Sequence, residues 1–157
     1  MLSRFEQQLK NSIERTTGSG STSRSASSAT VGDGVLHAEL SHAIVGAAIE
    51  VHRRIGPGQL ELLYQRALVK ELAFREIPHR AQVPIEMLYR GSSIGDLVVD
   101  LIVDDTIVVE LKAVSGFLAV HKAQVLSYLR ATNLRLGLLI NFNVPVLWRG
   151  VHRVVRG

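Results

Sequence analysis

The sequence contains no cysteine, which excludes disulfide bonds and thiolate metal sites. Any metal ion must therefore be bound by carboxylate oxygens or imidazole nitrogens. No apolar run is long enough to cross a membrane, and the first ten residues lack the apolar core of a secretory signal. We therefore expect a cytoplasmic protein with no membrane partner. Glycine-rich phosphate loops, GxSxG elbows and paired-histidine zinc motifs are also missing.

Charge is not concentrated in any one block of the chain. The net charge is +4, and a hydrophobic content of 46% in 157 residues can bury the core of one domain. The small positive excess is compatible with a polyanionic partner and does not require one.

The first 34 residues differ in composition from the rest. Residues 18–30 are rich in serine and glycine and too poor in apolar residues to fold, so we expect a flexible tail over residues 1–34 and one domain over 35–157. Apolar residues recur at helical spacing near the start of the tail, which leaves open a short partner-binding helix on a tether. These residues are Leu2, Phe5, Leu9 and Ile13.

Residues 96–113, DLVVDLIVDDTIVVELKA, predict a β-hairpin with its turn at 104–106. In this register Val103 pairs with Ile107, and Asp100 lies opposite Glu110 with Cβ atoms about 4.5–5.5 Å apart. A slip of one residue would separate the two carboxylates onto opposite faces. One face is wholly apolar and should be buried: Leu97, Val99, Leu101, Val103, Ile107, Val109, Leu111 and Ala113.

Like charges opposite one another destabilise a sheet unless a positive charge lies between them. A divalent cation would supply that charge, and Lys112 lies two residues beyond Glu110 on the same face as both carboxylates. Carboxylates that hold Mg²⁺ beside a lysine are the parts that metal-dependent phosphodiester hydrolysis needs. The alternative is a solvated sheet face with mixed charge.

The remaining elements alternate helices with strands. We expect helices near 39–54, 60–74 and 118–132, and strands near 83–89, 136–142 and 146–155, in addition to the hairpin. Residues 90–95 should form a turn, and Pro84 suggests an edge strand. The order predicts an α/β (α+β) fold in which helices cover the faces of a mixed sheet.

Three further positions are candidates for the same site. Glu61 begins the second helix, with Tyr64 one turn later; the alternative is a first-turn glutamate stabilised by the helix dipole and a half-buried packing tyrosine. Gln124 and Tyr128 lie four residues apart on the third helix, where a polar edge could reach the carboxylates. His121 could bind a metal, although a single histidine is more often a surface residue.

Several of these segments together resemble the GxxExxY protein family. The segment GPGQLELLY, residues 56–64, provides its named positions Gly58, Glu61 and Tyr64. The likeness continues in order through the remaining segments and spans about residues 39–155. These segments are ALVKEL (67–72), QVPIEMLYRG (82–91), DLIVDD (100–105), VVELKAV (108–114), HKAQVLSYLR (121–130) and GLLINF (137–142).

This family is placed in the PD-(D/E)XK, restriction-endonuclease-like superfamily. The resemblance implies that Asp100 is the motif aspartate, that Glu110 and Lys112 are the (D/E)XK pair, and that Glu61 is the acidic residue from the preceding helix. Gln124 and Tyr128 match a QxxxY element of the superfamily. Val99 stands where the motif often has proline.

The resemblance implies a Mg²⁺- or Mn²⁺-dependent nuclease acting on nucleic acid, with DNA expected ahead of RNA. Asp100, Glu110 and Glu61 would be the metal ligands in this interpretation. Two alternatives remain open: a non-catalytic nucleic-acid-binding or assembly module that keeps the fold, and a nuclease whose specificity resides in a protein partner or homo-oligomer.

Overall fold

The computed structural model describes residues 36–157, which form three α-helices, five strands and one short 3₁₀ helix. The helices are α2 (Ala38–Ile55), α3 (Glu61–Phe74) and α4 (Ala119–Thr132). The strands are β1 (His79–Tyr89), β2 (Ser92–Val103), β3 (Ile107–Lys112), β4 (Leu136–Asn141) and β5 (Val151–Val155), and the 3₁₀ helix η1 spans Leu147–Gly150. The predicted tail and its short amphipathic helix lie outside the described residues.

The five strands form one mixed sheet in the order β1-β2-β3-β4-β5. Neighbouring strands run antiparallel except β3 and β4, which are parallel and are connected through α4. β1 is an edge strand, as Pro84 predicts. The predicted α/β (α+β) class with a mixed sheet is therefore confirmed.

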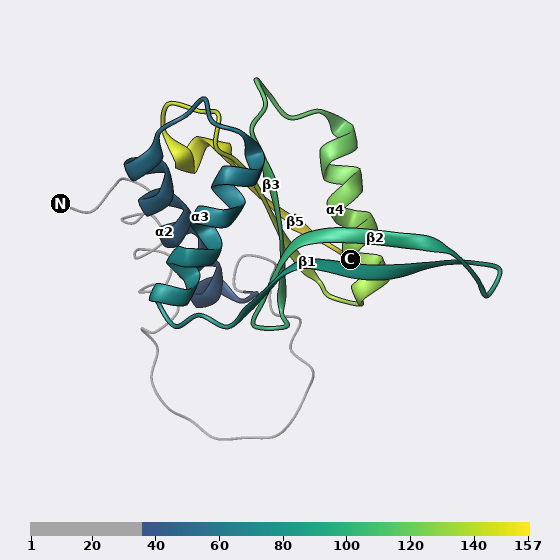
Figure 1. The fold of residues 1–157 in the computed structure, drawn as a ribbon. Helices are drawn as coiled ribbons and strands as arrows, with labels where there is room; N and C mark the ends of the chain where they lie inside the picture. Colours follow the sequence, from purple (N-terminus) through teal and green to yellow (C-terminus); the bar gives the residue numbers. More distant parts are fainter. Residues whose placement is uncertain (1–35) are drawn as a thin grey trace, which may run out of the picture. The chain divides into compact units, whose positions relative to one another are not determined.

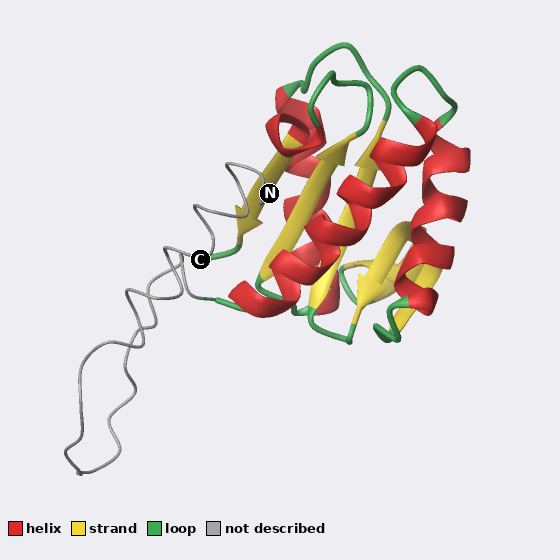
Figure 2. Cartoon of the chain, turned by 90° about the vertical axis from the view of Figure 1, so that its left-hand side faces the viewer, coloured by secondary structure: helices red, strands yellow, loops and turns green. Residues whose placement is uncertain are grey.

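The helices cover the two faces of the sheet unequally. α2 and α3 pack together on one side and α4 lies alone on the other (Figures 1 and 2). β3 and β4 are buried almost throughout because helices cover both of their faces. Among residues 36–157, no helix is long and apolar enough to cross a membrane.

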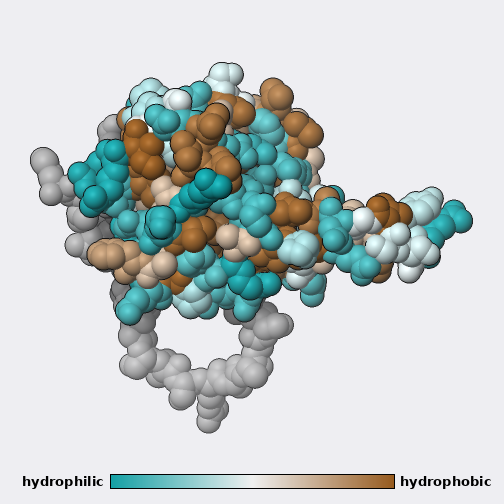
Figure 3. All heavy atoms as spheres, in the orientation of Figure 1, coloured by the Kyte–Doolittle hydropathy of each residue, from teal (hydrophilic) through white to brown (hydrophobic). Residues whose placement is uncertain are grey.

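The β1–β2 hairpin projects from the body of the domain as an arm (Figures 1 and 3). Its turn is shorter than predicted and consists of Arg90 and Gly91, which both have left-handed backbone conformations with φ of 50° and 80°. Residues 92–95, which we expected in the turn, belong to β2. Leu88, Tyr89 and Ile94 near the end of the arm are exposed.

The predicted register of the second hairpin is confirmed, because Val103 pairs with Ile107 and Leu101 with Val109. The predicted division of β2 into faces is wrong at Leu97 and Val99. Val99 belongs to the same apolar cluster as Ile102 and the α4 residues Val125 and Leu129, and Leu97 packs against that cluster, although Val99 and Ile102 are three positions apart. The alternation of side chains is therefore interrupted around Asp100.

The C-terminal strand is also shorter than predicted. Residues 147–150 form η1, and β5 begins only at Val151. Gly150 explains this local structure, because a Cβ atom at this position would collide with the carbonyl oxygen of Asn141. Glycine at this position thus allows the chain to pass close to the end of β4.

Candidate active site

Asp100 and Glu110 meet where β2 and β3 separate. The last paired residues of β2 and β3 are Leu101 and Val109, and the next positions along the two strands are Asp100 and Glu110. There the backbone N–H of Leu111 donates to Oδ2 of Asp100 at 2.8 Å, so a side chain takes the place of a further ladder hydrogen bond. The strand pair thereby holds the two carboxylates side by side.

Lys112 connects these carboxylates to α4. Its Nζ donates to Oε1 of Glu110 at 3.0 Å and to Oε1 of Gln124 at 3.1 Å. The amide nitrogen of Gln124 in turn donates to the hydroxyl of Tyr128 at 2.7 Å. The four side chains form one continuous polar chain from the sheet to the helix. Tyr128 is 4% exposed, so the end of this chain lies in the core.

Burial dominates the electrostatics of the carboxylate pair. Glu110 is 3% exposed, and burial followed by the negative charge of Asp100 raises its pKa to about 7, against the opposing effect of Lys112. Burial also raises the pKa of Asp100, although the hydrogen bond from the Leu111 backbone opposes this. The pair therefore resists carrying two negative charges without a cation.

Burial and the nearby carboxylates also raise the pKa of Tyr128. Burial is the larger cause, followed by the charge of Glu110, and together they move this pKa to about 12. The phenol therefore stays protonated at neutral pH. A neutral hydroxyl that accepts a hydrogen bond from Gln124 can donate its own proton to another oxygen.

Glu61 approaches the site from α3, on the other side of the sheet from α4. Burial raises its pKa, the positive charge of Lys112 lowers it, and the negative charge of Asp100 raises it further. These mutual effects place Glu61 in the electrostatic environment of the carboxylate pair. Glu61 is the first residue of α3, so the preceding loop determines its position.

Tyr64 fixes that loop from inside the core. Its hydroxyl donates to the carbonyl oxygen of Gly56 at 2.6 Å and accepts from the backbone N–H of Gln59 at 3.1 Å. Its ring is fully buried and stacks on Phe142 with centroids 4.5 Å apart. Tyr64 is therefore a packing residue, as our alternative reading held, but it is completely rather than half buried.

The donor set is compatible with a hard divalent cation but is incomplete. Oε2 of Glu110 is buried and has no hydrogen-bond partner within residues 36–157, and an oxygen in that state fits an oxygen-preferring cation such as Mg²⁺. No three Asp, Glu or His side chains in this part of the chain converge into one metal-binding group. Asp100 and Glu110 could thus hold the ion, and a ligand role for Glu61 stays a prediction.

His121 is engaged in local contacts. Its Nδ1 accepts a hydrogen bond from the backbone N–H of Leu118 at 3.0 Å, and its ring packs edge-on against Phe117. The contact with Leu118 lies at the start of α4, where the backbone N–H groups have no partner within the helix. His121 therefore provides a hydrogen-bond acceptor for a backbone N–H group at the start of α4.

Sequence reasoning missed two groups that support the site. Asn141 at the end of β4 donates to the carbonyl of Val114 at 2.8 Å and accepts from its N–H at 3.1 Å, which fixes the chain just after Lys112. A buried polar residue within the apolar run LGLLINF was the available signal. The other group is Gln82, which opens the quoted segment QVPIEMLYRG but was not considered as a site residue.

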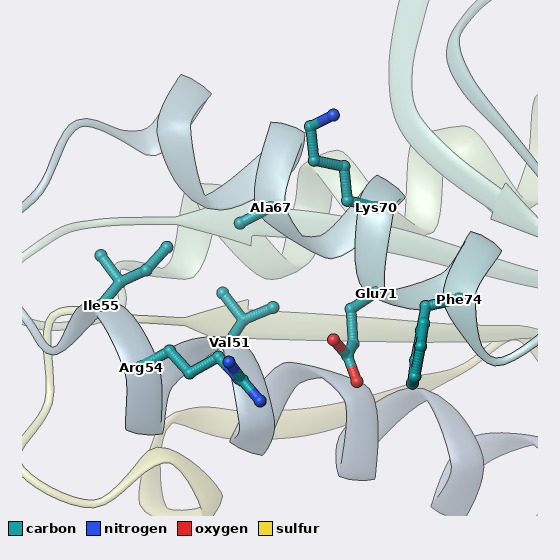
Figure 4. Close-up of a pocket in the computed structure, with 7 residues that line it drawn as sticks. All are labelled: Val51, Arg54, Ile55, Ala67, Lys70, Glu71 and Phe74. Carbon is teal, nitrogen blue, oxygen red and sulfur yellow. The ribbon is translucent and has the colours of Figure 1, made fainter.

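A pocket between α2 and α3 is separate from these residues. Figure 4 shows its lining, which contains none of the predicted site residues. The lining residues are Val51, Arg54, Ile55, Ala67, Lys70, Glu71 and Phe74.

The fold and the site together define a restriction-endonuclease-like domain with two carboxylates and a lysine where two adjacent strands separate. Residues 38–154, well over half of the chain, match the family model of the PD-(D/E)XK nuclease superfamily. The chain belongs to this superfamily, as its motifs predicted. No curated protein matches the chain.

Proposed function

We propose that this protein is a nuclease that uses Mg²⁺ or Mn²⁺ to hydrolyse phosphodiester bonds of nucleic acid. The observation that carries the proposal is the pairing of half-buried Asp100 with buried Glu110, in which one oxygen of Glu110 lacks a partner within residues 36–157 and the other accepts from Lys112. The membership in a superfamily of nucleases supports the same reaction class. The narrower GxxExxY assignment rests on Gly58, Glu61 and Tyr64.

In this mechanism Asp100 and Glu110 would hold the metal ion, and Glu61 would be a further ligand or would contact one of the two ligands. A bound divalent cation lowers the pKa of a coordinated water and neutralises charge on the phosphate. Lys112 donates to Glu110 and Gln124, which leaves one of its three N–H groups for the attacking water or a phosphate oxygen.

Gln124 and Tyr128 have a supporting part in the proposed reaction. Gln124 orients the Lys112 ammonium by accepting one of its protons, and it donates to Tyr128. The Tyr128 hydroxyl can then donate to a phosphate oxygen. An oriented ammonium stabilises the negative charge that develops on the phosphate without reorganising during the reaction.

The test is cleavage of single-stranded, double-stranded and branched DNA, and of RNA, with Mg²⁺, with Mn²⁺ and with EDTA. We expect metal-dependent cleavage that Lys112→Ala lowers by roughly 10²–10³-fold, the usual cost of one group that stabilises transition-state charge. Lys70→Ala, an exposed lysine on α3, is the matched control and should cleave normally. Absence of cleavage by the wild type on every substrate, or equal cleavage by Lys112→Ala, would overturn the proposal.

A further inference from the structure

Gln82 has an unusual backbone conformation at the point where β1 passes Asp100. Ala81 pairs with Leu101 and Val83 pairs with Val99, so Gln82 lies between these two pairs and opposite Asp100. Its φ of 50° is in the left-handed region, which is unfavourable for glutamine and rare inside a strand. Such conformations persist only where the surrounding structure enforces them, and they gather at functional sites.

The side chain of Gln82 makes the contacts that accompany this conformation. Its Nε2 donates to Oε1 of Gln65 at 2.9 Å, and Gln65 is a buried residue of α3 with 8% exposure. Burial raises the pKa of the Asp100 carboxyl, and the Gln82 side chain, which lies opposite it across β1 and β2, opposes that rise. Gln82 thus bridges a helix on one side of the sheet and a carboxylate of the candidate site.

Asp100 is consequently held from two directions. The Leu111 backbone N–H binds its Oδ2 from β3, and the Gln82 amide approaches from β1. The break in side-chain alternation on β2 falls at this residue as well. An aspartate fixed by two neighbouring strands loses little freedom when it binds a cation, because its orientation is already established.

We propose that Gln82 is a positioning residue that, braced by Gln65, orients the Asp100 carboxylate for a divalent cation shared with Glu110. This inference rests on the proposed function, since it assumes that Asp100 binds metal. It adds to the site a residue that contacts neither substrate nor metal and acts only through Asp100.

The test is the affinity of the purified protein for Mn²⁺, measured without nucleic acid by electron paramagnetic resonance of free Mn²⁺. Gln82→Gly removes the side chain while accepting the left-handed backbone readily, so the variant should fold. We expect its Mn²⁺ affinity to fall about 10–100-fold, the usual effect of removing a group that orients a metal ligand. Gln82→Asn also tolerates a positive φ, but its side chain is one methylene shorter and should not restore the affinity.

Two further variants separate positioning from a general effect on the fold. Arg90→Gly changes a residue with the same φ of 50° at the far end of the arm and should leave the Mn²⁺ affinity within about twofold. Gln65→Leu removes the brace and should weaken Mn²⁺ binding in the same direction as Gln82→Gly. Cleavage by Gln82→Gly should need more Mn²⁺ but recover when the metal is saturating.

The outcomes distinguish this inference from the proposed function. If wild type binds Mn²⁺ and cleaves, while folded Gln82→Gly binds Mn²⁺ equally well, the positioning role is overturned and the nuclease assignment stands. If wild type binds no Mn²⁺, both are overturned. Thermal unfolding of each variant verifies that the comparison is between folded proteins.

Discussion

Replacing Glu110 by glutamine should stabilise the metal-free protein at neutral and alkaline pH. Glutamine keeps the shape of the side chain and an oxygen for Lys112, and it removes the charge that burial and Asp100 disfavour. Its amide nitrogen would occupy the place of Oε2, which has no partner within residues 36–157, and could donate to Asp100. The substitution therefore removes a repulsion without creating a cavity.

The magnitude follows from the shift in the Glu110 pKa. This pKa is raised from the ordinary 4.5 to about 7, and each unit corresponds to about 1.36 kcal/mol, so the charged form costs the folded state up to about 3 kcal/mol. Part of this gain in stability is lost in the variant, because a neutral glutamine pairs less strongly with Lys112. We expect a gain of about 1–3 kcal/mol in the free energy of unfolding at pH 8.

The sign of the pH dependence is fixed by the same shift. As the pH rises above 4.5, the unfolded chain releases the Glu110 proton while the folded chain keeps it until about pH 7. The unfolded state then binds fewer protons, so wild-type stability falls across this window and levels off above it. The advantage of Glu110→Gln should therefore be absent near pH 4 and complete near pH 8.

Urea unfolding in EDTA at a series of pH values measures this difference directly. Glu50→Gln is the control, because hydrogen bonds from Arg53 and Arg54 lower the pKa of the Glu50 carboxyl. Its charged form therefore stabilises the folded state, and removing that charge should lower the free energy of unfolding at pH 8 instead of raising it. Addition of Mn²⁺ should stabilise wild type and not Glu110→Gln. A variant no more stable than wild type at pH 8, or a gain that does not vary with pH, would refute the electrostatic reasoning.

Two predictions concern the packing that supports the site. Tyr64→Phe keeps the stack on Phe142 but removes the hydroxyl between Gly56 and Gln59, and it should lower the free energy of unfolding by about 1–3 kcal/mol in urea titrations; an unchanged midpoint would show that the loop does not depend on this hydroxyl. Gly137→Ala places a Cβ atom against Val125 of α4 and should cost about 1–3 kcal/mol, measured by thermal unfolding; full stability would mean that α4 is free to move away from β4.

Periodicity predicted the central hairpin well because two independent signals agreed. The apolar faces of its strands coincide when Val103 pairs with Ile107, whereas a slip of one residue would separate them, and a short polar turn at 104–106 permits that pairing. The proximity of Asp100 and Glu110 followed from this register alone. The contact between Lys112 and Gln124 could be anticipated only as a helix edge packing over the sheet.

The parts that periodicity missed depend on backbone irregularity. Strict alternation predicted that Val99 and Leu101 point to the same face of the sheet. In the structure the alternation of side chains is interrupted around Asp100, opposite Gln82 with its left-handed backbone. Glutamine carries no local signal for a positive φ, unlike glycine or asparagine. The bracing of Asp100 was therefore invisible in the sequence, because it depends on how consecutive elements pack against one another and not on a local pattern.

The projecting arm gives the domain a part whose length can change independently of the site. From Asp100 toward Ser92, β2 pairs with β1 and no longer with β3. Leu88, Tyr89 and Ile94 near the turn are exposed. Adding or deleting one residue on each strand would invert the side chains beyond that point, whereas a change of two per strand preserves every facing. The arm can thus be lengthened or shortened in such steps, and its reach could vary among relatives or in engineered variants while Asp100 and Glu110 stay in place.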